Sequence, residues 1–290
     1  MLTRRQILKA LGLTAAASSL PSVVFAKTDS DARFVLVILR GALDGLALAA
    51  PYGDGNYAAM RGALALPPPT ESDGLLEMDG LFGLHPSMSG VFDLYRRDEA
   101  LIVHAVASPY RQRSHFDGQD LLELGTNRVG ALRDGWLNRA LKPLGATGVP
   151  AVALAANTPL VLRGDNAVTS WAPSRLPDAD DSTLARLQRL YAEDEFFATR
   201  LEQALRAQEI AMDMGDGGQR GNEARQFGEL ASAAARFLDA DDGPRIAVLE
   251  FGGWDTHANQ GTSNGQLANR FAALDTGLDN LKNGLGENWD

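Results

Sequence analysis

The stretch that decides the fold is residues 246–260, IAVLEFGGWDTHANQ. It opens with an apolar run lying between a Gly-Pro pair and a Gly-Gly pair, and this pattern predicts a buried strand. The Gly-Gly pair permits a sharp turn because it carries no Cβ. Asp255 and His257 follow at once, so a carboxylate and an imidazole are expected just past the carboxyl end of a strand. Ligands bind at that edge in open α/β sheets.

Asp255 and His257 form an Asp-x-His pair beside the glycine turn. Such a pair is suited to metal binding or to acid–base chemistry. The alternative interpretation is that Asp255 caps a turn and His257 is an ordinary exposed loop residue.

A second stretch repeats this pattern near the start of the chain. Phe34–Leu39, FVLVIL, contains six consecutive apolar residues, which predicts a central strand buried on both faces. Residues 40–45, RGALDG, follow directly and contain Asp44. If both strands are parallel and central, Asp44 lies at the same sheet edge as Asp255. The alternative is a simple Asp-Gly turn.

A third apolar run, residues 100–106 (ALIVHAV), predicts another buried strand, with His104 as a core histidine rather than a catalytic one. The segment after it is polar and basic, and a helix is expected from Ser114 to Leu124, ending before Gly125.

Ser114 admits two interpretations. With Asp117 three residues later it has the spacing of a capping box. A hydroxyl at the positive end of a helix, with Arg111 and Arg113 beside it, is also suited to contact an anionic ester or to attack it. Ser114 and the adjacent His115 are therefore the candidate catalytic residues, and the two arginines are candidates for substrate binding.

The remaining pattern alternates strands with helices, which predicts an α/β fold with a mostly parallel sheet and helices on both faces. His85, in the Leu-His-Pro that opens a helix, is interpreted as a capping or packing residue, with a ligand role as the alternative. The other expected elements are an irregular excursion over 52–73, a short helix after 134–136, a strand over 149–155, helices over 182–212 and 223–238, and a last helix over 267–281 capped by Gly284.

Composition limits the possible functions. The chain has 290 residues, 45% of them hydrophobic, and a formal net charge of -10. This composition predicts a globular protein, and its acidic balance argues against nucleic acid or an anionic membrane surface as a partner. The chain has no cysteine, which excludes disulfides, cysteine nucleophiles and thiolate metal sites.

Residues 1–26 have the pattern of a twin-arginine signal peptide. Arg4-Arg5 precedes a modestly apolar stretch that ends in a Val-Phe-Ala cleavage site at Ala26. An amphipathic terminal helix is the alternative. The apolar segment is too short for a stable membrane span. We therefore expect export by the twin-arginine translocase to the periplasm or beyond, and a single mature domain over 27–290.

Four motifs in this order resemble one family. They are RGALDG at 40–45, SHFDGQD at 114–120, DGWLNR at 134–139 and GGWDTH at 252–257. With the twin-arginine pattern, they are similar to the exported bacterial proteins of the domain of unknown function 1501 family. That family is placed in the alkaline phosphatase-like superfamily, with sulfatases and cofactor-independent phosphoglycerate mutases.

The resemblance implies an alkaline phosphatase-like fold with a metal centre at the strand ends. It implies that Asp44, Asp255 and His257 bind a divalent metal ion, whether zinc, manganese, magnesium or calcium, and that Ser114 is the hydroxyl nucleophile. It also implies a metal-dependent hydrolase of phosphate or sulfate esters, using Ser114 or a metal-bound water on a small anionic ester. The alternative is a non-catalytic exported protein for binding or assembly that keeps the fold and a structural metal.

The family pattern continues into a strand with a Thr-Glu-Phe-Gly-Arg-like motif and then an Asp-His-Gly motif that supplies further metal ligands. This sequence ends before both. We therefore expect the chain to be incomplete at its C-terminus and its metal centre to be open.

Overall fold

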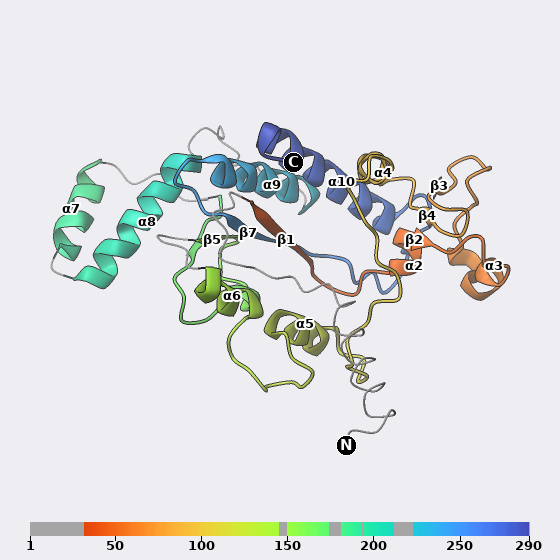
Figure 1. Ribbon diagram of the computed structural model, residues 1–290, viewed down its shortest axis with the longest axis horizontal. Helices are drawn as coiled ribbons and strands as arrows, with labels where there is room; N and C mark the ends of the chain where they lie inside the picture. Colours follow the sequence, from red (N-terminus) through yellow and green to blue (C-terminus); the bar gives the residue numbers. More distant parts are fainter. Residues whose placement is uncertain (1–31, 145–149, 174–180, 193, 212–222, 290) are drawn as a thin grey trace, which may run out of the picture.

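The computed structural model describes residues 32–144, 150–173, 181–192, 194–211 and 223–289 (Figure 1). The expected signal peptide, residues 1–26, lies outside these ranges. The strands are β1 (Phe34–Leu39), β2 (Ala49–Ala50), β3 (Leu76–Glu77), β4 (Gly83–Leu84), β5 (Ala151–Leu154), β6 (Thr169–Ser170) and β7 (Ile246–Phe251). The α-helices are α2 (Gly45–Leu48), α3 (Tyr57–Arg61), α4 (Ser89–Arg96), α5 (His115–Leu124), α6 (Trp136–Leu144), α7 (Asp181–Tyr191), α8 (Glu195–Ala211), α9 (Glu223–Asp239) and α10 (Gln266–Leu285). Short 3-10 helices are η1 (Gly62–Leu64), η2 (Leu160–Leu162) and η3 (Gly286–Trp289).

The main sheet has four strands in the order β1-β7-β5-β6. Every neighbouring pair is parallel, and Leu39 at the end of β1 lies opposite Phe251 at the end of β7. The loops that follow β1 and β7 therefore leave the sheet at the same edge. This is the arrangement predicted for Asp44 and Asp255.

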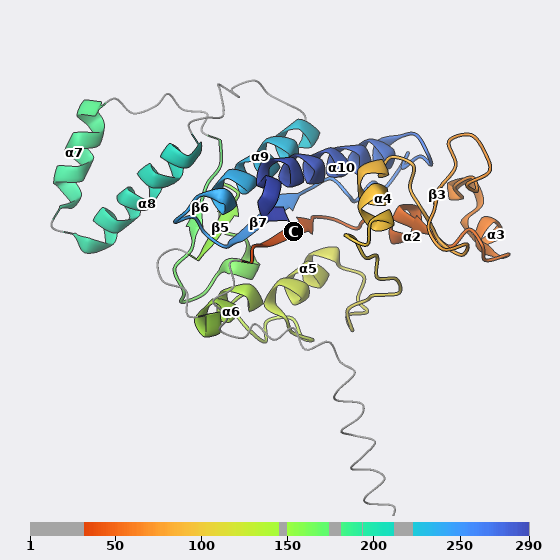
Figure 2. The same cartoon turned by 45° about the horizontal axis from the view of Figure 1, so that its top comes forward.

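Helices cover both faces of the sheet, as predicted. Alternate residues of β1 contact two different apolar clusters, because successive side chains of a strand point to opposite faces. One cluster contains side chains of α9 and α10, and the other contains side chains of α6. Figures 1 and 2 show α9 and α10 on one side of the sheet and α5 and α6 on the other. The fold is therefore α/β.

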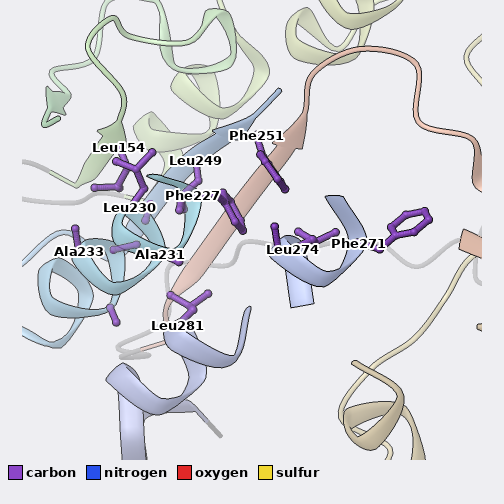
Figure 3. Packing of buried hydrophobic residues seen from close by; sticks show 14 of the residues in the cluster. Leu154, Phe227, Leu230, Ala231, Ala233, Leu249, Phe251, Phe271, Leu274 and Leu281 are labelled. Atoms are coloured by element: carbon purple, nitrogen blue, oxygen red, sulfur yellow. The ribbon is translucent and has the colours of Figure 1, made fainter. Parts of the chain in front are cut away.

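The larger cluster joins β7 to α9 and α10. The rings of Phe227 from α9 and Phe251 from β7 are stacked with their centroids 4.6 Å apart, and Leu281 of α10 lies in the same cluster (Figure 3). Gly277 of α10 lies against Phe227, and a Cβ at this glycine would be 2.3 Å from a carbon of that ring. The two helices therefore pack closely because residue 277 has no side chain.

A small antiparallel sheet, in the order β2-β4-β3, lies beyond the main sheet (Figure 1). It has its own small apolar cluster, which includes Ala50, Tyr57, Leu66 and Leu75. The irregular excursion expected over 52–73 contains α3 and η1, and Tyr57 holds it in place by accepting a hydrogen bond from the amide of Leu66 at 3.1 Å.

Two strand predictions were wrong. Among the described residues β1 pairs only with β7, so it is an edge strand, and its six residues are half-buried instead of fully buried. Residues 100–106 form no strand: Leu101 is 82% exposed and Val103 66%. The φ angle of +55° at Ala105 lies in the left-handed region, which interrupts an extended backbone.

Three helix boundaries also differ from prediction. The helix expected over 182–212 is two helices, because the carboxylate of Asp194 accepts hydrogen bonds from the amides of Phe196 and Phe197 and caps α8. The helix after His85 begins at Ser89, and Gly286 rather than Gly284 follows the last residue of α10. None of the helices in the described ranges is long and apolar enough to cross a bilayer.

Candidate functional site

The loops after β1 and β7 are in direct contact. The amide of Trp254 donates a hydrogen bond to the carbonyl of Arg40 at 3.3 Å. Gly41 has a φ of +123°, and a Cβ at this position would be 2.7 Å from the backbone nitrogen of Asp255. Glycine is thus required at residue 41, both for its backbone angle and for the approach of the Asp255 loop.

Asp255 lies next to two imidazoles. Its Oδ2 is 2.6 Å from Nε2 of His257 and 3.7 Å from Nδ1 of His115. His115 is the first residue of α5, so this contact joins α5 to the loop after β7. The side chains of Asp255 and His115 are about 30% exposed, and that of His257 is 83% exposed. A partly exposed carboxylate oxygen close to two imidazole nitrogens offers oxygen and nitrogen donors of the kind that bind a cation.

The backbone of this loop is unusual. His257 and Asn259 have φ angles of +44° and +53°, in the left-handed region that residues other than glycine seldom adopt. Backbone strain of this kind is concentrated at functional sites. Here it accompanies the turn that brings the imidazole of His257 onto Asp255.

Asp44 is held by other partners. Its carboxylate accepts a hydrogen bond from the amide of Leu46, which makes it the N-cap of α2. Its Oδ2 also lies 2.5 Å from a guanidinium nitrogen of Arg61 and 2.9 Å from Nε2 of Gln260. Burial opposes ionisation of Asp44, but the hydrogen bonds from Gln260 and Arg61 and the charge of Arg61 outweigh it and lower the pKa.

Gln260 links Asp44 to the Asp255 loop. Its Oε1 accepts a hydrogen bond from the hydroxyl of Thr256 at 3.1 Å, while its amide nitrogen donates to Asp44. Asp44 and Asp255 therefore lie at the same edge of the sheet, but Arg61 is the charged partner of Asp44.

Ser114 has the capping role that its spacing predicted. Its Oγ accepts a hydrogen bond from the amide of Asp117 at 3.2 Å, and it is the N-cap of α5. The hydroxyl of Tyr110 donates to the carboxylate of Asp117, and this hydrogen bond raises the pKa of Tyr110. The amino end of α5 is therefore capped by contacts within residues 110–117.

The two arginines before Ser114 are exposed. Arg111 donates a hydrogen bond to the carbonyl of Ser108 at 3.2 Å. Arg113 has a φ of +59°, which turns the chain into α5. Both flank the amino end of the helix, where the catalytic and substrate-binding roles remain predictions.

The chain was expected to resemble a known family because of four motifs in its sequence, and comparison with known proteins tests that expectation. The sequence matches the family described as "Protein of unknown function (DUF1501)" over residues 31–290. The chain belongs to the DUF1501 family. No curated protein and no solved structure matches it.

The side chains around Asp255 in this DUF1501 protein are of the types that bind a divalent cation. One carboxylate and two imidazoles are oxygen and nitrogen ligands that suit zinc or manganese. Within the described ranges, however, no three acidic or imidazole groups are arranged as a metal site. Asp44 is drawn to Arg61, and the 2.6 Å contact between Asp255 and His257 is that of a direct hydrogen bond.

Arg40 organises part of this DUF1501 site that the sequence did not predict. Its guanidinium pairs with Glu250 of β7 and with Glu123 of α5, and it also donates to Oε1 of Gln119 at 3.2 Å. Burial opposes the charge of Arg40, but the two glutamates outweigh it and raise the pKa. The one signal in the sequence was Glu250, a charged residue inside the apolar run of β7.

Proposed function

We propose that this DUF1501 protein hydrolyses phosphate or sulfate esters at the edge of the sheet where β1 and β7 end. The observation that carries the proposal is that Oδ2 of Asp255 lies near two imidazoles, 2.6 Å from His257 and 3.7 Å from His115. A carboxylate that orients an imidazole favours proton transfer, because it stabilises the imidazolium that forms.

The neighbouring groups supply the other parts of such a reaction. Ser114 stands next to His115 at the amino end of α5, where the helix dipole favours a negative group. One of the two lone pairs of its hydroxyl oxygen accepts from the amide of Asp117, so an attack by Ser114 would use the other lone pair or release the cap. The alternative nucleophile is water activated by an imidazole. Arg111 and Arg113 lie beside this helix end and would neutralise charge on the ester.

Asp255, His257 and His115 would hold a divalent cation, and Asp44 would join them only by leaving Arg61. Zinc, manganese, magnesium and calcium are the candidates. A cation bound there would neutralise the charge on the ester and lower the pKa of a coordinated hydroxyl group.

A substrate panel tests this proposal. The full chain is assayed with aryl phosphate, aryl phosphodiester and aryl sulfate, with each of the four cations and with chelator. Asp255→Asn should lower kcat/KM by about 100-fold or more, since it removes the carboxylate charge that pairs with His257 and lies near His115. The matched control is Asp242→Asn, because Asp242 is 85% exposed and pairs only with Arg206 among the described residues. Equal activity in the two variants would exclude Asp255 from the chemistry.

Ser114→Ala separates the two nucleophiles. Loss of activity together with loss of a covalent phospho-enzyme identifies Ser114 as the nucleophile. Retained activity assigns the attack to water. Because the substitution also removes an N-cap, it should cost about 1 kcal/mol of stability in either case. The activities are therefore compared at a temperature where both proteins are folded.

A second candidate function is binding or assembly without catalysis. It is favoured by two contacts: Asp44 is paired with Arg61, and Ser114 caps α5. Both side chains then have structural roles, and the fold would hold at most a structural metal. A protein that binds metal stoichiometrically, gains thermal stability from it and turns over none of the three esters would support this candidate.

We further propose that residues 1–26 direct export through the twin-arginine translocase to the periplasm or beyond. The support is Arg4-Arg5 before an apolar stretch and the Val-Phe-Ala site that ends at Ala26. Replacing both arginines by lysine should keep the precursor in the cytoplasm. Normal periplasmic accumulation of that double variant would contradict the proposal.

A further inference from the structure

A cavity of about 460 Å³ lies between the edge strand β6 and α8. It belongs to a different part of the molecule from Asp255, because β6 is at the opposite end of the sheet from β1. Figure 2 shows β6 beside α8, well away from α2. The cavity has the size of a small-molecule site.

Residues 162–166 form one wall of the cavity, and hydrogen bonds from α6 hold this wall in place. Asn138 of α6 is 1% exposed and donates hydrogen bonds to the carbonyls of Leu162 and Asn166 at 2.8 and 2.9 Å. Its side-chain oxygen Oδ1 accepts a hydrogen bond from the backbone amide of Asn166 at 3.2 Å. Gly164 lies against this amide group, and a Cβ there would be 2.3 Å from Oδ1 of Asn138. A buried polar side chain with satisfied hydrogen bonds thus fixes the shape of the wall.

The charge of the lining is opposite to that of the protein. The chain has a formal net charge of -10, yet the described residues that line the cavity include Arg163 and Arg200 and none that is acidic. Within the described part of the chain neither arginine forms a salt bridge. Arg163 donates through Nε to the carbonyl of Thr158 at 3.0 Å, and Arg200 donates through one guanidinium nitrogen to the carbonyl of Val168 and to Gln203. Both keep further N–H donors for a ligand.

We propose that this cavity binds a small anionic molecule through an oxyanion group, which can be a phosphate, a sulfate or a carboxylate. Arg163 and Arg200 both line this cavity, and an anion that reaches both would be bound by charge-assisted hydrogen bonds from the two guanidinium groups. Thr158, Thr169 and Ser170 also line the cavity and add hydroxyl groups that donate to oxygen. The size of the cavity selects a small molecule.

Calorimetric titration of inorganic phosphate into the full chain at low ionic strength tests the site. Replacing both arginines, Arg163→Gln with Arg200→Gln, should weaken binding by about tenfold or more, because each contributes hydrogen bonds to a charged group. The matched control is Arg206→Gln, on the same helix, since Arg206 pairs with Asp242 and does not line the cavity. It should bind phosphate like the unmodified protein. Repeating the titration with sulfate and with acetate identifies the preferred oxyanion.

Thermal unfolding provides a second readout that shows whether the variants fold. Phosphate should raise the Tm of the unmodified protein and of Arg206→Gln, but not that of the double variant, because a ligand stabilises only the state that binds it. Without phosphate the double variant should melt close to the unmodified protein, because both arginines are exposed and the contacts that it loses, their hydrogen bonds and the cation–π contact of Arg200 with Phe196, lie at the surface.

The Asp255→Asn variant separates this site from the proposed catalytic site. Phosphate binding that survives Asp255→Asn and is lost in the double arginine variant supports the cavity. Binding that is lost in Asp255→Asn and kept in the double variant would overturn it, as would equal binding by the double variant and Arg206→Gln.

Discussion

Two apolar runs of similar length adopt different structures in this protein, because one forms a buried strand and the other does not. β7, Ile246–Phe251, is buried and hydrogen-bonded to β1 on one side and to β5 on the other. Residues 100–106 are as apolar, but they form no strand, and Leu101, Val103 and Val106 are each more than 60% exposed. The difference shows that an apolar run becomes a strand only where neighbouring strands take up its backbone hydrogen bonds.

The flanking contacts of the two runs explain the difference further. β7 is followed by glycines that turn the chain at the end of the sheet. Residues 100–106 are attached to the body at two points: Ile102 packs against the main core, and the ring of His104 stacks on Phe82 with centroids 3.6 Å apart. Ala105, with its positive φ, then ends the extended path. The run therefore lies along the body with one side exposed.

The largest expected effect comes from truncating a leucine in each run. Leu249 is 1% exposed and Leu101 is 82% exposed. Leu249→Ala should lower the free energy of unfolding by about 2–5 kcal/mol, because it removes buried methyl groups and leaves a cavity. Leu101→Ala should change it by less than about 0.5 kcal/mol. Chemical denaturation measures both. A cost above about 2 kcal/mol at Leu101 would show that residues 100–106 form a buried strand in solution.

A smaller effect is expected from a glycine at the junction of β1 and β7. Gly41→Ala should cost about 1–3 kcal/mol, since the new methyl group would meet the backbone of Asp255 at a positive φ. Gly45→Ala is the matched control, because a Cβ at Gly45 has no neighbour within 4 Å. Denaturation of the two variants measures the difference. Equal stabilities would mean that the β1 and β7 loops are not in contact.

A pH-dependent effect is expected at His85, which tests the anchoring of the loop after β7. His85 is fully buried, its Nε2 lies 3.0 Å from the carbonyl of Thr262, and burial lowers its pKa. The unfolded chain binds a proton at His85 near pH 6.5, whereas the folded chain does so only at lower pH. The contribution of His85 to stability is therefore present above pH 6.5 and is lost as pH falls through the lowered pKa.

Urea denaturation between pH 8 and pH 5 measures this contribution. The unmodified protein should lose stability over the interval, and His85→Gln should show a flatter dependence, although it is less stable at pH 8. A variant that follows the same pH profile as the unmodified protein would exclude His85 as the source.

The smallest effect on stability is expected when residues 100–106 are made polar. Leu101→Ser with Val103→Ser should leave the free energy of unfolding within about 0.5 kcal/mol of the unmodified value, since both side chains are exposed. The double variant should bind less of a hydrophobic dye such as ANS, because an exposed apolar patch is removed. Unchanged dye binding together with a loss of stability would show that these side chains are packed.

The comparison also shows how much the sequence could predict. α5, α9, α10 and β7 were predicted close to their observed positions, because caps, glycines and apolar periodicity act over a few residues. The exposure of residues 100–106 and the edge position of β1 depend on which strands pair, which no local pattern encodes.

The candidate site also has features that local sequence patterns predicted and features that they did not. The common sheet edge of Asp44 and Asp255 followed from two strand-and-glycine patterns. The pairing of Asp44 with Arg61 and Gln260 could not be predicted, because it depends on how α3 and the loop after β7 fold back onto the start of α2. The break between α7 and α8 had a local signal, Asp194, whose side chain caps the second helix.

The attachment of α5 has a mechanical consequence. Its carboxyl end is clamped: Arg40 binds Gln119 and Glu123, Glu123 also accepts a hydrogen bond from the amide of Val161, and Arg139 donates to the carbonyl of Leu124. At its amino end, His115 lies 3.7 Å from Asp255 in the loop after β7. The second half of α5 is thus held by more contacts than its first turn, and Arg40 makes two of these contacts. At 1.5 Å of rise per residue, a tilt of about 10° about the residues that Arg40 binds moves Ser114 by roughly 1–2 Å. The distance from Ser114 to Asp255 can therefore change while every strand of the sheet stays in register.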